Sequence, residues 1–317
     1  KILIIGFGEI AQRHYRNLRF LLPDSEIAIL NKNKNPEYKK VIYLKNLEDE
    51  KKFNPNITLI CSPAPSHIKY ATIFSKLNSN IFIEKPVATK VDELKEFLKL
   101  IKNKKITLLS GYNLRFEKSF VFFQKIIKSK KLGKILSVRS EVGQYLPSWR
   151  SKVYTKTVSA NKNLGGGAIN ELSHDVDVLL MLFKNLKLIY GINLNVSNLK
   201  VNAEDSAHAI FRSNYNKKNF YIFLNIDFYR HDHTRTCTVI GTKATLKWDG
   251  ILNEIKIHKK NSKKQTLIKF NNNKNDSYLN EIKFFLKNIK KRNTLYNNFK
   301  ENLNLIKILK LIKKNKK

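Results

Sequence analysis

One short stretch, KILIIGFGEIA, constrains the fold of this chain more than any other feature. An apolar run of strand length leads into a glycine turn, and the next residues, QRHYRNLRFLL, have helical spacing. The first glycine of the GxGxxA pattern, Gly6, permits the turn, Gly8 lets a pyrophosphate approach the backbone, and the small Ala11 lets helix pack on strand. The first helical amides, those of Glu9, Ile10 and Ala11, then bind phosphate. The stretch predicts a dinucleotide-binding Rossmann unit.

The same strand and helix alternation continues for about a hundred residues. Strand patterns lie in residues 26–30, 56–67, 80–88 and 105–116, with helical stretches between them. This alternation is typical of a doubly wound α/β domain with a parallel sheet. We therefore predict a Rossmann domain over residues 1–112.

Polar side chains follow three consecutive strands of this predicted sheet. Ligands of such sheets bind at the carboxyl ends of the strands. The candidates for cofactor or substrate contacts there are Ser62, Pro63, His67, Glu84, Lys85, Asn113 and Arg115. Pro86 fixes the turn after Lys85. A lysine held at a rigid strand end beside the nicotinamide can bind a substrate hydroxyl and shift its proton affinity.

The residues after the second strand bear on the choice of cofactor. An acidic residue there would bind the ribose 2′-hydroxyl of NAD. The chain instead reads Asn31, Lys32, Asn33, Lys34, with no acid. A 2′-phosphate suits these lysines better than a hydroxyl does, so we expect NADP or NAD, with NADP slightly favoured.

The formal charge of +36 raises the alternative of a nucleic-acid or membrane-surface partner. Only ten of the 61 basic residues are arginine, and the lysines are scattered. Phosphate and base readers make heavy use of arginine, so we interpret the charge as compositional and expect neither partner. No apolar run reaches the roughly 18 residues of a membrane helix. The two cysteines form no metal or disulfide pattern, so we predict no metal and a cytoplasmic protein.

The stretch GGGAINELSHDVDVL, residues 165–179, allows two interpretations. It can be an amphipathic helix whose apolar stripe faces a core. It can also be a catalytic helix, because three glycines permit close approach to the backbone and Glu171, His174 and Asp177 cluster behind them. An acid or amide three or four residues before His174 shares a helix face with it.

The chain resembles the Gfo/Idh/MocA oxidoreductases in the order and spacing of its motifs. The matching segments are GFGEIAQRH at 6–14, SPAPSH at 62–67, EKP at 84–86, GYNLRF at 111–116, GGGAINELSHDVD at 165–177, AEDSA at 203–207 and IGTKATLKWD at 240–249. The resemblance implies a Rossmann domain, then a C-terminal α+β domain with an open, mainly antiparallel sheet. It also implies NAD(P)-dependent chemistry at a carbon of a sugar or cyclitol.

The resemblance implies catalytic roles for Lys85 and His174, with one departure from the family pattern. The family carries an Asp before the His; here that position falls on Glu171 or on Asn170, depending on how it is counted. We expect His174 to transfer the hydroxyl proton and Lys85 to stabilise charge on the same oxygen. Glu171 would orient His174 or hold a hydroxyl. Asp177 is either a substrate contact or a solvated acid.

The rest of the chain, residues 113–317, is predicted to form the substrate-binding and oligomerisation domain. Tyr145, Trp149 and Arg150 offer stacking faces and a cation to a sugar. Strand patterns lie in residues 186–196, 205–213, 220–230, 235–249 and 253–260, and their alternation predicts an antiparallel sheet with one solvated or partner face. The resemblance implies a homo-oligomer through this open sheet. Two helices end the chain, and the last can pack back on the Rossmann domain. The YLPSWR segment is similar to a subgroup associated with surface-sugar biosynthesis.

Two rival functions remain at this point. One is a catalytically inactive, nucleotide-binding regulatory protein, which the Asn170 and Glu171 ambiguity favours; retention of both Lys85 and His174 argues against it. The other is a nucleic-acid-binding protein, which the scattered lysines argue against. The HDH triplet at 231–233 lacks a third nearby ligand, so we interpret it as a solvated turn and not a metal site.

Overall fold

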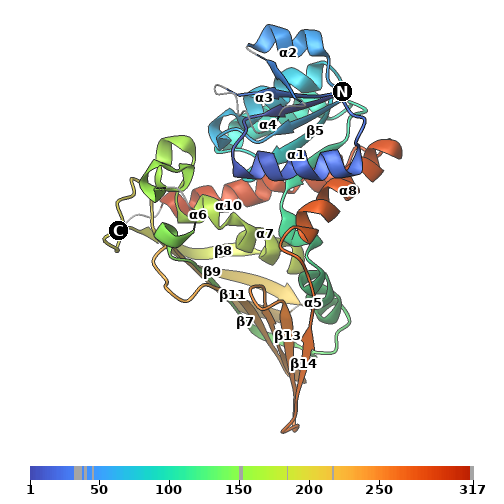
Figure 1. Ribbon diagram of the computed structural model, residues 1–317. Coiled ribbons are helices and arrows are strands. Elements are labelled where there is room, and N and C mark those ends of the chain that lie inside the picture. Colours follow the sequence, from blue (N-terminus) through green and yellow to red (C-terminus); the bar gives the residue numbers. More distant parts are fainter. Residues whose placement is uncertain are drawn as a thin grey trace. The chain divides into compact units, whose positions relative to one another are not determined.

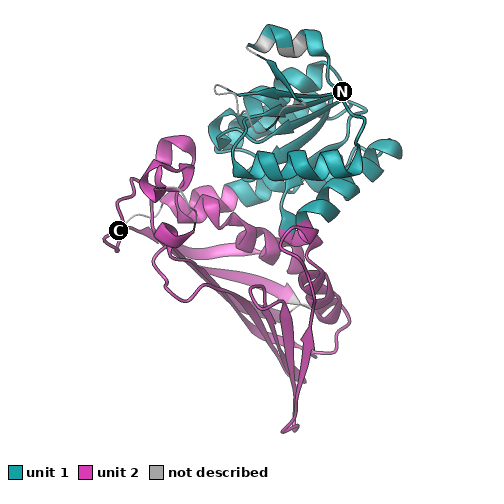
Figure 2. Ribbon diagram, viewed as in Figure 1, with its two compact units in different colours: residues 1–113, 278–306 teal, residues 114–277, 307–317 magenta. Residues whose placement is uncertain are grey.

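The computed structural model describes residues 1–31, 38, 41–44, 46–149, 153–183, 185–215 and 218–314 (Figure 1). The chain divides into two compact units (Figure 2). Unit 1 contains residues 1–113 and 278–306, and unit 2 contains residues 114–277 and 307–317.

Unit 1 is built on a six-stranded parallel sheet in the order β3-β2-β1-β4-β5-β6. The strands are β1 (Ile2–Ile5), β2 (Ile27–Leu30), β3 (Ile42–Leu44), β4 (Ile57–Ile60), β5 (Asn80–Glu84) and β6 (Leu108–Gly111). This is the strand order of the Rossmann fold, in which the switch of direction beside the first strand places ligands at the carboxyl ends. The four residues of β1 and of β4 are all buried, as parallel strands covered on both faces require.

Helices pack on both faces of this sheet. They are α1 (Glu9–Leu21), α2 (Leu47–Phe53), α3 (His67–Lys76), α4 (Val91–Ile101), most of α8 (Asp276–Lys290), α9 (Tyr296–Lys300) and the start of α10 (Asn302–Lys314). Ala11 and Leu18 of α1 pack against Ile2 and Ile4 of β1 in the core, together with Ile282 and Phe285 of α8. Residues 278–306 thus belong to the Rossmann unit, although they follow the second unit in sequence.

Unit 2 contains an eight-stranded sheet in the order β14-β13-β12-β11-β7-β10-β9-β8. The strands are β7 (Ile135–Gly143), β8 (Lys187–Leu194), β9 (Ser206–Tyr215), β10 (Lys218–Asp227), β11 (Thr234–Gly241), β12 (Ala244–Asp249), β13 (Glu254–Lys259) and β14 (Gln265–Lys269). Only the β7–β10 pair is parallel. The predicted fold class, a Rossmann domain plus an α+β domain with an open, mainly antiparallel sheet, is confirmed.

One face of the second sheet carries the helices of unit 2, namely α5 (Lys118–Lys128), α6 (Ala168–Glu171) and α7 (Ser173–Leu182). Strand residues alternate between buried and exposed, most clearly in β10, because only one face is covered. Trp248 of β12 is 1% exposed, and its indole N–H donates to Ser119 Oγ at the start of α5 at 2.9 Å. This contact fixes α5 on the sheet.

Several elements differ from the sequence predictions. The strands β3 and β14 and the helix α5 were not predicted, and the loop before the three glycines contains four short 3-10 helices: η3 (Leu146–Ser148), η4 (Tyr154–Lys156), η5 (Val158–Ala160) and η6 (Lys162–Leu164). The single helix expected behind the glycines is wrong. The chain leaves the helical conformation at Leu172, with φ −100° and ψ 20°, so α6 and α7 are separate.

Candidate functional site

The glycine turn between β1 and α1 has the backbone geometry that dinucleotide binding needs. Gly6 adopts φ +80°, and a Cβ there would come 2.9 Å from the Cys61 carbonyl oxygen, so only glycine fits. Around Gly8, in contrast, no protein atom lies within 4 Å of a Cβ position, which leaves room for a ligand to approach the backbone. Ala11 is fully buried between helix and strand. The turn fits a pyrophosphate at the start of α1, beside Glu9 and Ile10.

The residues expected to contact the ribose follow β2. Asn31 is partly exposed directly after Leu30, the end of that strand. Lys32 and Lys34 lie outside the described residues. Their proposed contact with a 2′-phosphate therefore stays a prediction.

The turn after β4 contains Ser62, Pro63 and His67. Pro63 is exposed and Ser62 is partly exposed, at the carboxyl end of the parallel sheet. His67 is only 1% exposed: its Nε2 lies 2.6 Å from the Ser62 carbonyl oxygen and its Nδ1 lies 2.9 Å from the Pro86 carbonyl oxygen. Burial lowers the pKa of His67, although the two carbonyls and Glu84 oppose that shift. The ring of His67 therefore makes contacts within unit 1.

The turn after β5 contains Glu84 and Lys85. Glu84 Oε1 lies 2.7 Å from His14 Nε2, and its Oε2 accepts the Lys85 backbone N–H at 3.1 Å. Lys85 is the only residue from Ile81 to Ala88 that is not buried. His14 is fully buried on α1 and was not singled out from the sequence. The available signal was its position three residues after Ala11, on the inner face of the helix.

A buried ion pair joins two residues that the sequence offered as separate substrate contacts. Arg115 Nε donates to Asp177 Oδ2 at 2.8 Å, and Arg115 Nη2 donates to Asp177 Oδ1. The two side chains are 14% and 3% exposed. The solvated-acid alternative for Asp177 is therefore wrong, because its carboxylate is buried and held in the two-pronged geometry that an arginine fork favours. Asn113, two residues before Arg115, is also buried, at 8% exposure, and belongs to unit 1.

The break at Leu172 changes the geometry expected around His174. Asn170 and Glu171 lie on α6 and His174 on α7, so they do not share one helix face as predicted. Asn170 Nδ2 donates to the Gly165 carbonyl oxygen at 2.8 Å, and Ser159 Oγ donates to Glu171 Oε2 at 3.1 Å. Both side chains contact the loop in front of α6.

His174 is the only residue from Gly165 to Leu179 that is not buried. The predicted amphipathic stripe is in fact buried all round, and polar residues on either side of His174 are enclosed. Asp175 is 1% exposed and lies 3.3 Å from Arg235 Nη2, and burial raises the pKa of its carboxyl group. Arg235, on β11, was another residue that the sequence did not reveal. His174 is therefore the one side chain of residues 165–179 that is accessible to solvent, and it is titratable.

Other segments of the chain lie close to the backbone of Gly166 and Gly167. A Cβ at Gly166 would come 2.0 Å from the Val158 carbonyl oxygen. Gly167 adopts φ +100°, and a Cβ there would come 2.4 Å from Glu204 Oε1. Gly166 is therefore explained by packing against residues 158–161 and Gly167 by packing against Glu204, while Gly165 adopts a left-handed backbone with φ +85°.

The aromatic residues expected to stack on a sugar lie on the loop after β7. Tyr145 packs against His231 with the two rings tilted and their centroids 4.5 Å apart, and Trp149 packs edge-on against Phe228 with a centroid distance of 5.8 Å. Both are partly exposed. Arg150 lies outside the described residues.

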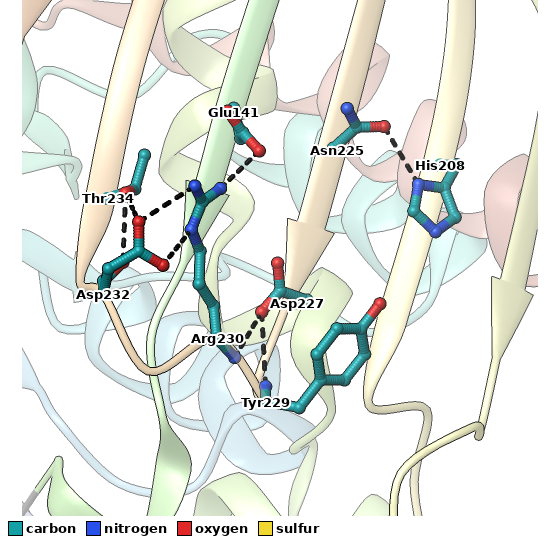
Figure 3. Close-up of polar contacts among 8 residues, drawn as sticks. All are labelled: Glu141, His208, Asn225, Asp227, Tyr229, Arg230, Asp232 and Thr234. Carbon is teal, nitrogen blue, oxygen red and sulfur yellow. Dashed lines mark hydrogen bonds and ion pairs between the residues drawn. The ribbon is translucent and has the colours of Figure 1, made fainter.

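The turn that follows β10 carries an ion-pair network at the HDH triplet. Asp232 binds the Arg230 guanidinium, which also contacts Glu141 of β7, and Asp227 accepts the backbone N–H groups of Tyr229 and Arg230 (Figure 3). Within the part of the chain that the structure describes, no three His, Cys, Asp or Glu side chains form a group that could hold a metal ion.

The fold and the glycine turn define an α/β protein of the NAD(P)-binding type, and comparison with known families agrees. The model described as an oxidoreductase family with an NAD-binding Rossmann fold, GFO/IDH/MocA, matches residues 1–112. The model of the GFO/IDH/MocA C-terminal domain matches residues 120–247. The chain belongs to the GFO/IDH/MocA oxidoreductase family.

The similarity to individual curated proteins covers only part of each chain. The uncharacterised oxidoreductase YhhX of Escherichia coli is 30% identical to this chain over 188 residues. The matched region is 56% of this chain and 52% of that protein. The chain thus spans about half the length of the curated relatives it matches. Within the described ranges, no helix is long and apolar enough to cross a membrane.

Solved structures share the fold over almost the full chain. A levoglucosan dehydrogenase in complex with NADH and levoglucosan superposes with a TM-score of 0.82 at 16% identity, over 99% of this chain and 95% of that one. A mutant of the 3-ketoreductase KijD10 from Actinomadura kijaniata, in complex with TDP-benzene and NADP, superposes with a TM-score of 0.81 at 11% identity. This match covers 100% of this chain and 97% of that one.

Proposed function

We propose that this protein is an NAD(P)-dependent dehydrogenase or reductase that acts on a hydroxyl or keto carbon of a sugar or sugar derivative. The proposal rests on the exposure of one residue in each unit. Lys85 is the one partly exposed residue of residues 81–88, and His174 is the one partly exposed residue of residues 165–179. Lysine and histidine are among the side chains that take part in general acid–base catalysis, and in these two segments they alone are accessible to a substrate.

Each of the two residues has a distinct proposed role. The Lys85 ammonium donates a hydrogen bond to the substrate oxygen and stabilises the charge that develops there. His174 accepts the hydroxyl proton during oxidation and returns it during reduction, since imidazole titrates near neutral pH. The nicotinamide supplies hydride transfer at its C4. Residues 1–112 are proposed to bind the cofactor and residues 113–317 the substrate.

The substrate class is proposed from the family and from the site. The levoglucosan complex and the TDP-benzene complex belong to proteins of the same fold, which supports a sugar or an activated sugar. Tyr145 and Trp149 offer partly exposed rings to a sugar face. An activated sugar for surface-glycan synthesis is the finer form of this proposal. A catalytically inactive regulatory protein is the alternative, and it predicts cofactor binding without turnover.

The first test is a fluorescence titration of the purified protein with NADPH and NADH at about 150 mM salt, where exposed charges are screened. We expect both to bind and NADPH to bind more tightly, because Asn31 and two lysines follow β2 where an acid would favour NAD. Tighter binding of NADH would instead make the proposed NADP preference wrong. If neither nucleotide binds, the oxidoreductase proposal is wrong. A screen of sugars and sugar nucleotides for absorbance change at the nicotinamide band follows.

We also propose that the open sheet face of unit 2 joins copies of this chain. Three aromatic side chains on that face, Tyr190, Tyr221 and Phe223, are 46%, 47% and 43% exposed. Analytical ultracentrifugation should show an oligomer that Phe223→Glu dissociates, because a charge would enter an apolar interface. Leu100→Glu, on α4 of unit 1, is the control and should not change the assembly. A monomeric wild-type protein would refute the proposal.

A further inference from the structure

The backbone around Lys85 is held on both sides by fully buried side chains of unit 1. We propose that His14 and His67 are positioning residues that fix the turn carrying Lys85. The inference rests on the proposed function in one respect, namely that Lys85 contacts the substrate. It adds two residues that cannot touch a substrate themselves, because His14 is 0% and His67 1% exposed.

The first support reaches Lys85 from its N-terminal side. His14 Nε2 lies 2.7 Å from Glu84 Oε1, and the other carboxylate oxygen, Oε2, accepts the N–H of Lys85 at 3.1 Å. The Glu84 carboxylate thus bridges a helix side chain and the backbone of the turn. Because a buried carboxylate needs partners for both oxygens, the bridge fixes the Glu84 side chain and the Lys85 peptide group together.

Packing leaves this bridge little freedom to move. The His14 ring lies edge-on against Phe82 of β5, with centroids 4.9 Å apart, and near Tyr278 at 6.2 Å. On the other side, a Cβ at Gly111 of β6 would come 3.0 Å from the Glu84 carboxyl carbon. Glu84 is therefore enclosed by α1 and by the neighbouring strand, and its carboxylate has little room to move.

The second support reaches the turn from its C-terminal side. His67, the first residue of α3, places Nδ1 2.9 Å from the carbonyl oxygen of Pro86, the residue after Lys85. Its other nitrogen, Nε2, lies 2.6 Å from the Ser62 carbonyl oxygen. The ring therefore lies between the turn after β5 and the turn after β4, with a carbonyl acceptor at each nitrogen, and both turns lie at the carboxyl edge of the sheet where ligands bind.

The two contacts of His67 are not equivalent for Lys85. A neutral imidazole carries one N–H, and it donates to both carbonyls only when protonated. Burial lowers the pKa of His67, which favours the neutral ring. The proposal requires that Nδ1 carries the proton, since only that tautomer holds Pro86. The charged groups that face the ring are Glu84 and Lys85.

Fixing the backbone on both sides of Lys85 reduces the number of positions from which its ammonium group can approach a substrate oxygen. A shift of about 1 Å at such a group costs as much as a hundredfold in rate, because the hydrogen bond to the developing charge depends on orientation. Loss of either histidine contact should therefore lower kcat while leaving the cofactor turn at Gly6 and Gly8 intact.

Asparagine and glutamine provide matched substitutions at both positions. The asparagine amide nitrogen replaces Nδ1, and the glutamine amide nitrogen replaces Nε2, since each is the same number of bonds from the backbone. His14 acts through Nε2, so His14→Gln keeps its contact and His14→Asn loses it. His67 acts on Pro86 through Nδ1, so His67→Asn keeps that contact and His67→Gln loses it. At each position, the Asn and the Gln variant both lose the imidazole ring, so both lose the packing contacts of that ring.

The experiment measures all four full-length variants with NADPH and the best sugar from the screen. We expect kcat to fall at least about tenfold in His14→Asn and His67→Gln relative to their partners, with KM for the sugar and Kd for NADPH within about twofold. Exchange of the Lys85 amide hydrogen, followed by NMR, should speed up at least about tenfold in the same two variants. Thermal melting shows whether each variant folds.

The outcomes separate this inference from the proposed function. If the wild-type protein turns over no sugar, the function is wrong, and Lys85 amide exchange still decides whether the histidines hold the turn. Equal kcat and equal amide exchange within each pair would refute positioning, whatever the melting temperatures. The reverse order at position 67, with Gln active and Asn impaired, would show that the Ser62 contact matters and overturn the assignment of Nδ1. An unfolded variant at one position leaves the pair at the other to decide.

Discussion

Replacing Arg115 with methionine should lower the free energy of unfolding of unit 2 by about 3–5 kcal/mol. Asp177 is only 3% exposed, and two nitrogens of the Arg115 guanidinium bind its two carboxylate oxygens. Without Arg115, this buried carboxylate would have to stay charged without its cation or take up a proton, and both cost free energy. The stabilising effect of the pair is therefore smaller than the cost of breaking it.

Tryptophan fluorescence in a urea titration measures this effect directly. The chain has two tryptophans, and both Trp149 and Trp248 belong to unit 2. The transition followed by fluorescence therefore reports the unit that contains the ion pair. Trp248 is 1% exposed, so its emission should change strongly on unfolding.

Two controls distinguish a buried charge from lost packing. The double variant Arg115→Met with Asp177→Leu should recover most of the stability, because an apolar pair can replace a buried ion pair at little cost. Lys118→Met removes an exposed ion pair of the same unit, whose lysine is 55% exposed, and should cost no more than about 1 kcal/mol. An Arg115→Met protein as stable as Lys118→Met would mean that the buried pair does not hold unit 2 together.

The predictable part of this fold lies in local patterns. The first strand, the glycine turn and α1 are specified by consecutive residues, and the left-handed backbone of Gly6 confirms the predicted turn. The strands that were missed lack such a pattern. β14 is almost entirely exposed, so it shows no alternation of apolar and polar residues, and β3 has only three residues, none of them buried. These strands form because an existing sheet offers an edge to pair with.

The site was harder to predict, because the partners of its residues lie far away in sequence. Glu84 and His67 follow strands and so resemble ligand contacts, but His14 is 70 residues from Glu84 and Pro86 is 19 from His67. Asp177 lies one turn after His174, which suggested a shared role, yet its partner is 62 residues away. The break at Leu172 involves neither glycine nor proline, so no local residue predicts it. The partners of these polar side chains depend on which of the side chains are buried, and a single sequence does not show burial at polar positions.

The second large effect is expected at His174. His174→Ala should reduce turnover of the best substrate by roughly 10²-fold or more, because the proposed proton acceptor for the hydroxyl is removed. In the oxidation direction, the wild-type kcat/KM should rise with pH as the imidazole loses its proton, and the variant should lose that dependence. NADPH affinity should not change, since the proposed cofactor contacts all lie in residues 1–112.

The structure supplies a matched control and a reason to expect a clean result. His258, an exposed histidine of β13 in the same unit, should tolerate the same substitution without loss of turnover. The neighbours of His174 are enclosed, and the two ion pairs Asp175–Arg235 and Asp177–Arg115 hold α7 without it. Truncating the one partly exposed side chain of this segment should therefore leave the backbone in place. Turnover within about twofold of wild type would remove His174 from the reaction, and an unchanged pH profile would do the same even if the rate fell.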